Sequence, residues 1–317
     1  MINVEVIEAS RSPQGVTLWT IAMTYPRFIH SELMTHRVFS RNASSSRAIP
    51  IIKSIMAVLR NSAMPVAWGS HKAGMQAGED LTGIRLGIVK AAWGAAKYAA
   101  VGCAWVAMKA GAHKQIANRM LEPWSHITVL VSSTDWSNFD ALRNHPDADP
   151  TIEELAKQIV AARSDYQGFG KVKDLEPGEW HLPYITDAEY EASWRRFGPH
   201  EFEAYQWLRK LSAAYCARVS YLTHGGENPD YEKDIQLYER LAMHEPMHAS
   251  PLEHQATPDT TSWQETVSIV GNVTTAIKAG QAYDNPELHG NFHGFIQNRK
   301  LLDNENVVDS HYKRKLA

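Results

Sequence analysis

The chain has 317 residues, a formal net charge of −3 and a charged fraction of 21%, which are ordinary values for a globular protein with a sizeable core. Such a charge gives no global basic field to hold a nucleic acid polymer. An anionic ligand must therefore meet a local cluster of arginines, as a small phosphate-bearing molecule does. Two cysteines, Cys103 and Cys216, are too few for a disulfide framework.

Neither a signal peptide nor a membrane span is expected. The first ten residues lack a basic start followed by an apolar run. The most apolar stretch, Ala91–Met108, is interrupted by Lys97, and its alanine content favours a buried helix over a membrane span. We therefore expect a cytoplasmic protein that does not enter a membrane.

The first elements in chain order are a hairpin and a helix. Alternating apolar and polar residues over Asn3–Thr24, around a Ser-Pro-Gln-Gly turn, predict a β-hairpin. From Tyr25 onward, the spacing of apolar residues favours a helix with one apolar face. In such a helix, Glu32, His36 and Ser40 share one side.

Helices and irregular segments follow, without repeats, so we expect one domain over 1–317. The polar run 41–47 predicts a loop, and 51–111 predicts a helical insertion with a glycine-containing loop near 69–83. The stretch 164–200, rich in glycine, proline and aromatic residues, predicts a long loop or linker. Further helices are expected over Asn138–Arg143, Thr151–Ala162, Glu201–Val219 and Pro229–His244, and a strand over Ile127–Val131.

The densest polar segment, Thr35–Arg47, holds one histidine, three arginines, one asparagine and four serines. These side chains suit a phosphate or the edge of a flat heteroaromatic ring, although a solvated helix end with a serine-rich turn has a similar composition. The pattern His-Arg-x-x-Ser-x-Asn-x-x-Ser-x-Arg, which begins at His36, resembles the signature of the flavin-dependent thymidylate synthases. Thr35 stands where that signature begins with an arginine.

Further blocks resemble the same family. Ala117–Pro123 and Asn138–Arg143 are similar to its segments with a phosphate-binding arginine and with an Asn-Phe-x-x-Leu-Arg helix. Ala217–Tyr221 and His248–His254 are similar to a stretch that precedes the His-Arg motif in the family. Here this stretch follows the motif by about two hundred residues, so the order looks circularly permuted, as in a phage-type enzyme. Gly290–Lys300 weakly resembles the start of the motif and is expected to be an unrelated helix.

The resemblance implies an α+β fold, with the mixed sheet flanked by helices of thymidylate-synthase-complementing proteins. It implies a homotetramer whose active sites draw on several subunits, FAD as cofactor, and methylene-tetrahydrofolate and NADPH as co-substrates. The implied reaction is methylation of dUMP at C5 to give dTMP. No dinucleotide-binding Gly-x-Gly-x-x-Gly motif is present, so a separate nucleotide-binding domain is not expected.

The resemblance also assigns residues. Arg143 is the expected catalytic residue, at the O2/N3 edge of the pyrimidine, where it stabilises negative charge on the ring. Without the resemblance, Arg143 is better interpreted as an ordinary partner for a helical acid one turn away. The remaining substrate-binding residues are Glu32, Ser45, Arg47 and Arg119, and the flavin-binding residues are His36, Arg37, Ser40, Asn42, Asn138, Ser220, His248, Ser250 and Glu253.

Three alternatives stay open. A dCMP methylase or hydroxymethylase on the same scaffold is favoured by Glu32, whose carboxylate accepts from a cytosine amine. A non-catalytic protein that binds flavin or nucleotide is favoured by Thr35 and Ala43, which replace an arginine and a glutamate of the family. The third alternative is an all-helical interaction protein, in which case the motif matches are coincidental. A metal site at His248, Glu253 and His254 is a weaker alternative, because no cysteine or third ligand has zinc-site spacing.

Overall fold

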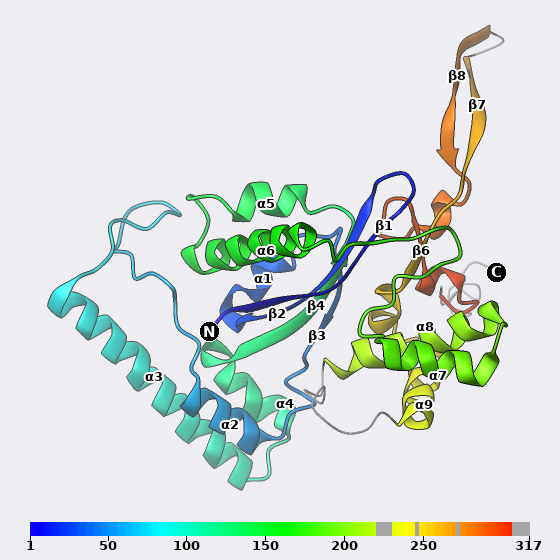
Figure 1. Ribbon diagram of the computed structural model, residues 1–317. Coiled ribbons are helices and arrows are strands. Elements are labelled where there is room, and N and C mark those ends of the chain that lie inside the picture. The colour runs from blue at the N-terminus through cyan, green and yellow to red at the C-terminus, as the bar shows by residue number, and fades with distance from the viewer. Residues whose placement is uncertain (220–229, 245–246, 271–272, 306–317) are drawn as a thin grey trace, which may run out of the picture.

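A mixed five-stranded sheet forms the centre of the computed structural model, which describes residues 1–219, 230–244, 247–270 and 273–305 (Figure 1). Its strand order is β3-β4-β2-β1-β5, antiparallel except for the β1/β5 pair. The described strands are β1 (Asn3–Arg11), β2 (Thr17–Pro26), β3 (Ser40–Ala43), β4 (His126–Ser133), β5 (Lys173–Asp174), β6 (Ala256–Pro258), β7 (Thr261–Val270), β8 (Val273–Tyr283) and β9 (Phe295–Gln297).

Helices flank this sheet, which confirms the expected α+β fold and rules out the all-helical alternative. The described α-helices are α1 (His30–Leu33), α2 (Ile51–Arg60), α3 (Gly83–Lys109), α4 (Lys114–Ala117), α5 (Ser137–Arg143), α6 (Pro150–Gly168), α7 (Asp187–Phe197), α8 (Glu201–Arg218) and α9 (Tyr231–Ala242). The 3-10 helices are η1 (Arg27–Ile29), η2 (Asn118–Trp124), η3 (Ser250–Glu253), η4 (Pro286–Leu288) and η5 (Asn298–Leu301).

The predicted N-terminal hairpin is present. Strands β1 and β2 pair from Asn3 opposite Thr24 to Arg11 opposite Thr17. The turn between them contains Gly15 at φ 81°, a left-handed conformation that glycine adopts without the steric cost of a Cβ atom. Strand β2 then pairs with β4, which lies about a hundred residues further along the chain, so the hairpin is held in the middle of the sheet.

The two faces of the sheet are buried in different ways. Helices α5 and α6 cover one face (Figure 1), where aromatic and aliphatic side chains such as Tyr25, Phe39 and Phe139 form the main apolar core. The end of α8 covers the other face, with Cys216 against Leu130 of β4. Burial of this apolar surface on both sides stabilises the sheet by roughly 25 cal/mol per Å² removed from water.

A buried polar network also lies on the α8 side of the sheet. His181 joins Ser10 (Nδ1···Oγ 2.8 Å) and Thr20 (Nε2···Oγ1 2.7 Å). Thr20 continues to Ser132 (2.5 Å), and Ser132 to Nδ1 of His254 (2.8 Å). All five side chains are fully buried, and these hydrogen bonds satisfy most of their polar atoms, although Nε2 of His254 has no partner among the described residues.

The helix predicted after Tyr25 is much shorter than expected. Helix α1 ends at Leu33, and Ser40 lies in strand β3, opposite Ser132 of β4. Glu32, His36 and Ser40 therefore do not share one helical face, and the predicted 41–47 loop begins inside the sheet. Pairing with β4 decides the conformation here, and local spacing of apolar residues carries no information about that distant partner.

Two further expectations need correction. The segment 51–111 is helical in α2 and α3, but Ala91–Met108 is not buried, since Ala104 is the one buried residue of α3. The prediction of a long loop or linker over 164–200 is wrong in part, because this segment contains α7. A capping box between Thr186 and Glu189 caps the N-terminus of this helix. Gly290–Lys300 is a short strand and a 3-10 turn instead of a helix.

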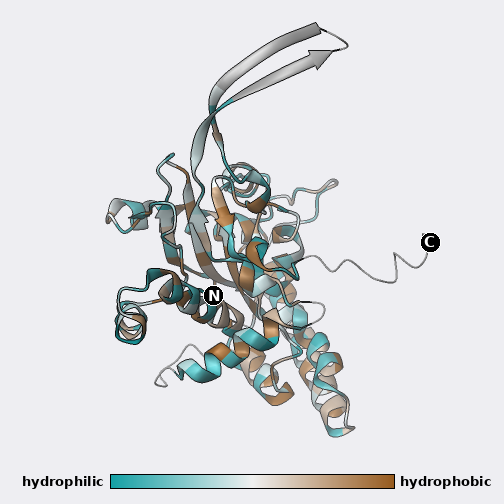
Figure 2. Cartoon of the chain, turned by 90° about the vertical axis from the view of Figure 1, so that its right-hand side faces the viewer, coloured by the Kyte–Doolittle hydropathy of each residue, from teal (hydrophilic) through white to brown (hydrophobic). Residues whose placement is uncertain are grey.

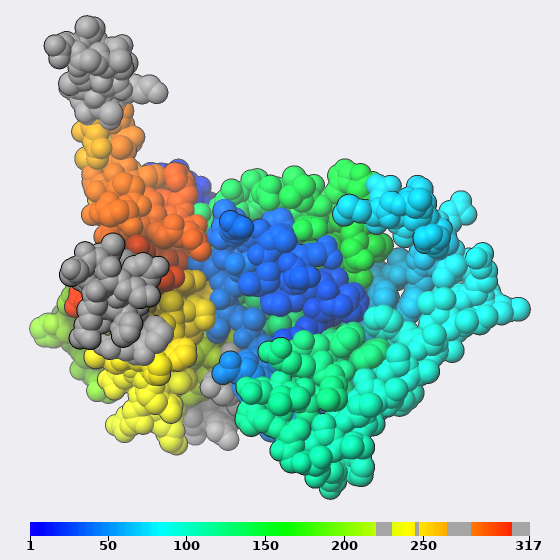
Figure 3. Space-filling view, turned by 180° about the vertical axis from the view of Figure 1, so that it is seen from behind, coloured from blue at the N-terminus to red at the C-terminus, as the bar shows by residue number. Residues whose placement is uncertain are grey.

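Strands β7 and β8 form a separate hairpin that stands away from the rest of the molecule (Figures 2 and 3). Helix α3 also reaches outward, at the opposite side in Figure 1. Among the residues that the structure describes, no helix combines the length and apolar character needed to cross a bilayer.

The buried histidines predict a pH-dependent stability. Burial lowers the pKa of His254 to about 3 and that of His181 well below its ordinary value. The unfolded chain takes up these protons first, so this contribution to stability is complete above about pH 6.5 and is lost as the pH falls. We expect the free energy of unfolding to drop by up to about 1.4 kcal/mol per pH unit for each histidine.

Urea denaturation between pH 7 and pH 5 measures this slope. The variant His254→Gln removes one titrating group, so its slope is shallower than that of the unchanged protein. His71→Gln, at an exposed position, is the control and keeps the original slope. Identical slopes in all three proteins contradict the assignment.

Candidate functional site

Arg143, the last residue of α5, connects this helix to the residues that precede β3. Its Nη1 lies 3.1 Å from Oε2 of Glu32, and its Nη2 donates to Oγ1 of Thr35 at 3.2 Å. Its acidic partner, Glu32, is 111 positions away in the sequence. Arg143 is therefore not the ordinary partner of an acid one turn away in its own helix. The first two motif blocks thus meet in space.

His36 lies beneath this arginine. Its Nε2 accepts a hydrogen bond from Nε of Arg143 at 3.1 Å. Its ring packs edge-on against that of Phe139, with 5.0 Å between the ring centres. Burial, followed by the positive charge of Arg143, lowers the pKa of His36, while a hydrogen bond with Asn138 opposes the shift. His36 is therefore neutral near pH 7 and holds the guanidinium by accepting from it.

Glu32 supplies the countercharge. Burial, followed by the nearby charge of Asp149, raises the pKa of this carboxyl group, whereas Arg143 lowers it. The side chain of Glu32 is about one-third exposed and that of Arg143 one-fifth, so the pair is open to a ligand from one side. A ligand here meets a donor and an acceptor side by side.

Residues in or next to the third motif block contact side chains of β3. Nδ2 of Asn42 donates to the carbonyl of Cys216 at 2.6 Å, and Oδ1 of Asn42 accepts from Ser250 at 3.2 Å. Ser40 accepts from Nε2 of Gln297 at 3.0 Å. Ser40 and Asn42 are buried, and these internal bonds occupy them, so they position the strand and η3 instead of presenting free polar groups.

The remaining flavin-binding candidates differ in exposure. Glu253 of η3 forms an ion pair with Arg299 and lies near enough to Arg41 to raise the pKa of that guanidinium against the effect of burial. His248 is exposed, with its ring 4.8 Å from that of His244. Arg37, which follows His36 in the chain, and Asn138, which hydrogen-bonds to His36, are exposed. Ser220 lies outside the described residues.

The expected phosphate-binding residues lie at the other end of β3. Arg47 and Arg119 are both exposed. Asn118, next to Arg119, donates to the carbonyl groups of Ser46 and Ile49 at 2.7 and 2.9 Å, so η2 holds the loop that carries Ser45 and Arg47. The four residues of β3 span roughly 13 Å, at about 3.3 Å per residue, between this end and the segment that contacts Arg143.

Sequence reasoning missed two residues of this region, Gln297 and Arg299. Gln297 binds both Ser40 and the carbonyl of Glu253, and Arg299 pairs with the Glu253 carboxylate. The weak likeness of Gly290–Lys300 to the start of the first motif was the one available signal. Across the described residues, no group of three or more histidine, cysteine, aspartate or glutamate side chains is placed to hold a metal ion.

No protein-family model and no curated protein matches this sequence. Solved structures with partial likeness include the UMP/dUMP methylase PolB from Streptomyces cacaoi. Its 5-Br dUMP complex has a TM-score of 0.44 at 18% identity, covering 55% of this chain and 97% of PolB. Its 5-Br UMP complex has a TM-score of 0.40 at 18% identity, covering 55% and 96%.

The flavin-dependent thymidylate synthase ThyX from Helicobacter pylori, complexed with FAD and dUMP, has a TM-score of 0.33 at 14% identity. The likeness covers 50% of this chain and 74% of that protein. TM-scores below 0.5 are too low to transfer a function or a ligand to this chain.

The bonds of Asn42 predict the effect of removing them. In Asn42→Ala, the buried Cys216 carbonyl and the Ser250 hydroxyl lose their partner, so we expect a loss of about 1–3 kcal/mol in the free energy of unfolding. Chemical denaturation measures this loss. The exposed Arg37→Ala is the control and changes stability by less than about 0.5 kcal/mol. Equal stability of the two variants contradicts a structural role for Asn42.

Proposed function

We propose that this chain is a flavin-dependent transferase that moves a one-carbon unit from methylene-tetrahydrofolate to C5 of dUMP and yields dTMP. The observation that carries the proposal is that three motif blocks, far apart in sequence, meet along β3. His36 contacts Arg143, and Asn42 contacts Ser250. If the matches to the family's motifs were coincidental, we would not expect the matching segments to lie next to one another around the same strand.

The described residues fit a flavin. Arg37 and Asn138 are exposed donors near the buried, neutral His36, and such donors suit the phosphates and the polar edge of FAD. When bound, a flavin supplies hydride chemistry that side chains lack, with NADPH as the expected source of electrons. Neither cysteine is needed as a nucleophile, and Cys216 is unsuited to that role because burial raises the pKa of its thiol.

The Arg143–Glu32 pair offers the groups that a pyrimidine ring needs. The contacts of Arg143 with Glu32, Thr35 and His36 use its Nε hydrogen, one Nη1 hydrogen and the Nη2 group. One Nη1 hydrogen of the guanidinium, which has five N–H donors, stays available for a ring oxygen. The adjacent Glu32 carboxylate accepts from N3–H of uracil, so the pair matches the O2/N3 edge of dUMP.

Glu32 also supports a second candidate reaction. A carboxylate accepts equally well from the exocyclic amine of cytosine, and the family places a glutamine at this position. A dCMP methylase or hydroxymethylase on this scaffold therefore stays the alternative. Release of tritium from C5 of labelled dUMP, compared with labelled dCMP, separates the two substrates, and chromatography of the product separates methyl from hydroxymethyl.

The residues expected at the phosphate end lie at the opposite end of β3 from the residues that Arg143 contacts. Arg47, Arg119 and Ser45 lie beyond the far end of this strand, whose four residues span roughly 13 Å. We propose that a neighbouring copy contributes them, as in the homotetramers that the sequence resemblance implies. Arg47 is exposed on a loop fixed by Asn118 and is therefore suited to contact a ligand in another subunit's site.

Removal of Arg143 tests the catalytic assignment. We expect Arg143→Ala to lower tritium release from C5 of dUMP by about 10²–10³-fold, because the ring then loses its charge stabilisation. Binding of FAD, measured by fluorescence quenching, stays within about twofold. Arg27→Ala is a matched control that removes an arginine paired with Glu122 at 3.2 Å, and both readouts stay unchanged. Loss of FAD binding, or normal turnover, in Arg143→Ala argues against the assignment.

A subunit-mixing experiment tests the shared site. Arg47→Ala is expected to raise the KM for dUMP at least tenfold, the effect of losing about 1.4 kcal/mol from a charge-assisted phosphate contact. Mixing Arg47→Ala with Arg143→Ala under conditions of subunit exchange then restores part of the turnover, because some sites combine two intact surfaces. Activity that stays at the level of the separate variants refutes a site built from two chains.

A further inference from the structure

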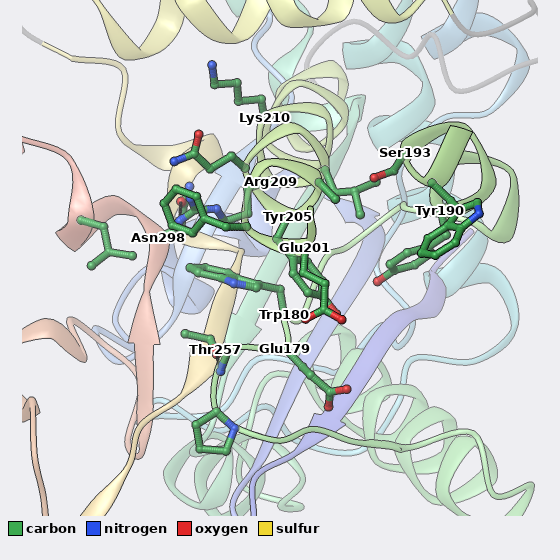
Figure 4. Close-up of a pocket in the computed structure, with 18 of the residues that line it drawn as sticks. Glu179, Trp180, Tyr190, Ser193, Glu201, Tyr205, Arg209, Lys210, Thr257 and Asn298 are labelled. Atoms are coloured by element: carbon green, nitrogen blue, oxygen red, sulfur yellow. Dashed lines mark hydrogen bonds between the residues drawn. The ribbon is translucent and has the colours of Figure 1, made fainter. Parts of the chain in front are cut away.

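A second site is suggested by a cavity of about 910 Å³ on the α7/α8 side of the molecule (Figure 4). Its walls come from α7, α8, the segment 177–180 and η5. None of its lining residues belongs to the predicted substrate or flavin sites. The volume is at the upper end of the range for small-molecule sites in proteins, about 300–1,000 Å³.

Arg209 gives one wall of this cavity a positive charge. Its guanidinium lies 4.3 Å from the centre of the Trp180 ring, and its Nη1 donates to Asn298 at 3.4 Å. The Nε atom is buried without a hydrogen-bond partner, and the side chain forms no ion pair within the described part of the chain. A partly buried cation without a countercharge favours an anion beside it.

A second polar group in the wall also lacks a partner. The side chain of Ser193, on α7, is 2% exposed, and its hydroxyl forms no hydrogen bond among the described residues. Buried hydroxyl groups are nearly always paired, because leaving one unpaired costs about 1–3 kcal/mol. Ser193 and Arg209 stand on adjacent helices that line the same cavity.

Aromatic rings surround these polar groups. Trp194 and Phe202 line the cavity although they are 66% and 70% exposed. Tyr190 and Tyr205, which are half-buried, also line it (Figure 4). Large aromatic side chains gathered at an opening mark ligand sites more often than plain surface. Flat rings stack on such side chains, with about 1–3 kcal/mol per base in nucleic acid complexes.

Carboxylates stand at another part of the wall. Glu179 and Glu201 both lie near Tyr205 (Figure 4), and burial, followed by these two charges, raises the pKa of its hydroxyl. Carboxylates accept hydrogen bonds from the hydroxyl groups of a sugar or from a ring amine. The cavity thus combines a cation, aromatic rings and acceptors, which correspond to the phosphate, base and sugar of a nucleotide.

We propose that this cavity binds a nucleoside monophosphate, with its phosphate at Arg209, its base among the aromatic rings and its sugar hydroxyls toward the carboxylates. This second site is separate from the proposed methylation site. Lys210 also lines the cavity, with its ammonium group 5.7 Å from the centre of the Tyr238 ring.

Isothermal titration of the full-length protein with AMP tests the proposal. We expect AMP to bind measurably, and adenosine and inorganic phosphate each to bind at least tenfold more weakly, because each lacks half of the contacts. Arg209→Gln weakens AMP binding at least tenfold. Arg195→Gln is the matched control, because this exposed arginine on α7 pairs with Glu191 outside the cavity, and it binds AMP as the unchanged protein does.

A second variant tests the proposal independently in case Arg209→Gln does not fold. Phe202→Ser alters a mostly exposed side chain, so the fold stays intact while stacking is lost and AMP binds several-fold more weakly. Absence of AMP binding by the unchanged protein at millimolar concentration overturns the proposal, as does unchanged binding in both Arg209→Gln and Phe202→Ser. Turnover of dUMP is measured in parallel. Its presence without AMP binding rejects this site alone, and its absence with AMP binding rejects the proposed reaction alone.

Discussion

The pairing of β3 with β4 is the constraint on which the candidate site depends. It runs from Ser40 opposite Ser132 to Ala43 opposite Val129 and fixes both ends of a four-residue strand. The chain before β3 then lies against α5, which starts just after β4, and the chain after β3 lies against η2. Side chains of β3 also bind Ser250 of η3 and Gln297 of β9. One short strand thus gathers residues from four parts of the sequence.

Charge and burial give the two ends of β3 different chemical character. At one end, Arg143 is held by an acid and a neutral histidine in a partly buried setting, which suits an uncharged ring on which charge develops during a reaction. At the other end, Arg47 and Arg119 are exposed without described partners holding them, which suits a phosphate that arrives with its full charge.

Much of this arrangement could be predicted from the sequence, and the failures have common causes. The hairpin at Asn3–Thr24 and the helix at Asn138–Arg143 depend on local patterns, and the structure confirms both. Strand β3 was missed because its residues are polar and its partner is distant. The exposure of α3 was missed because alanine-rich composition favours a helix without specifying what packs against it. Buried roles for Ser40 and Asn42 depend on Gln297 and Cys216, which no motif connects to them.

Titration of the purified protein with FAD, followed by visible absorbance and flavin fluorescence, tests the central claim most directly. The account predicts a yellow protein, or saturable uptake of one FAD per chain, and a marked weakening of that uptake in Arg37→Ala with the fold intact. A colourless protein that neither perturbs the flavin spectrum nor quenches its fluorescence contradicts it.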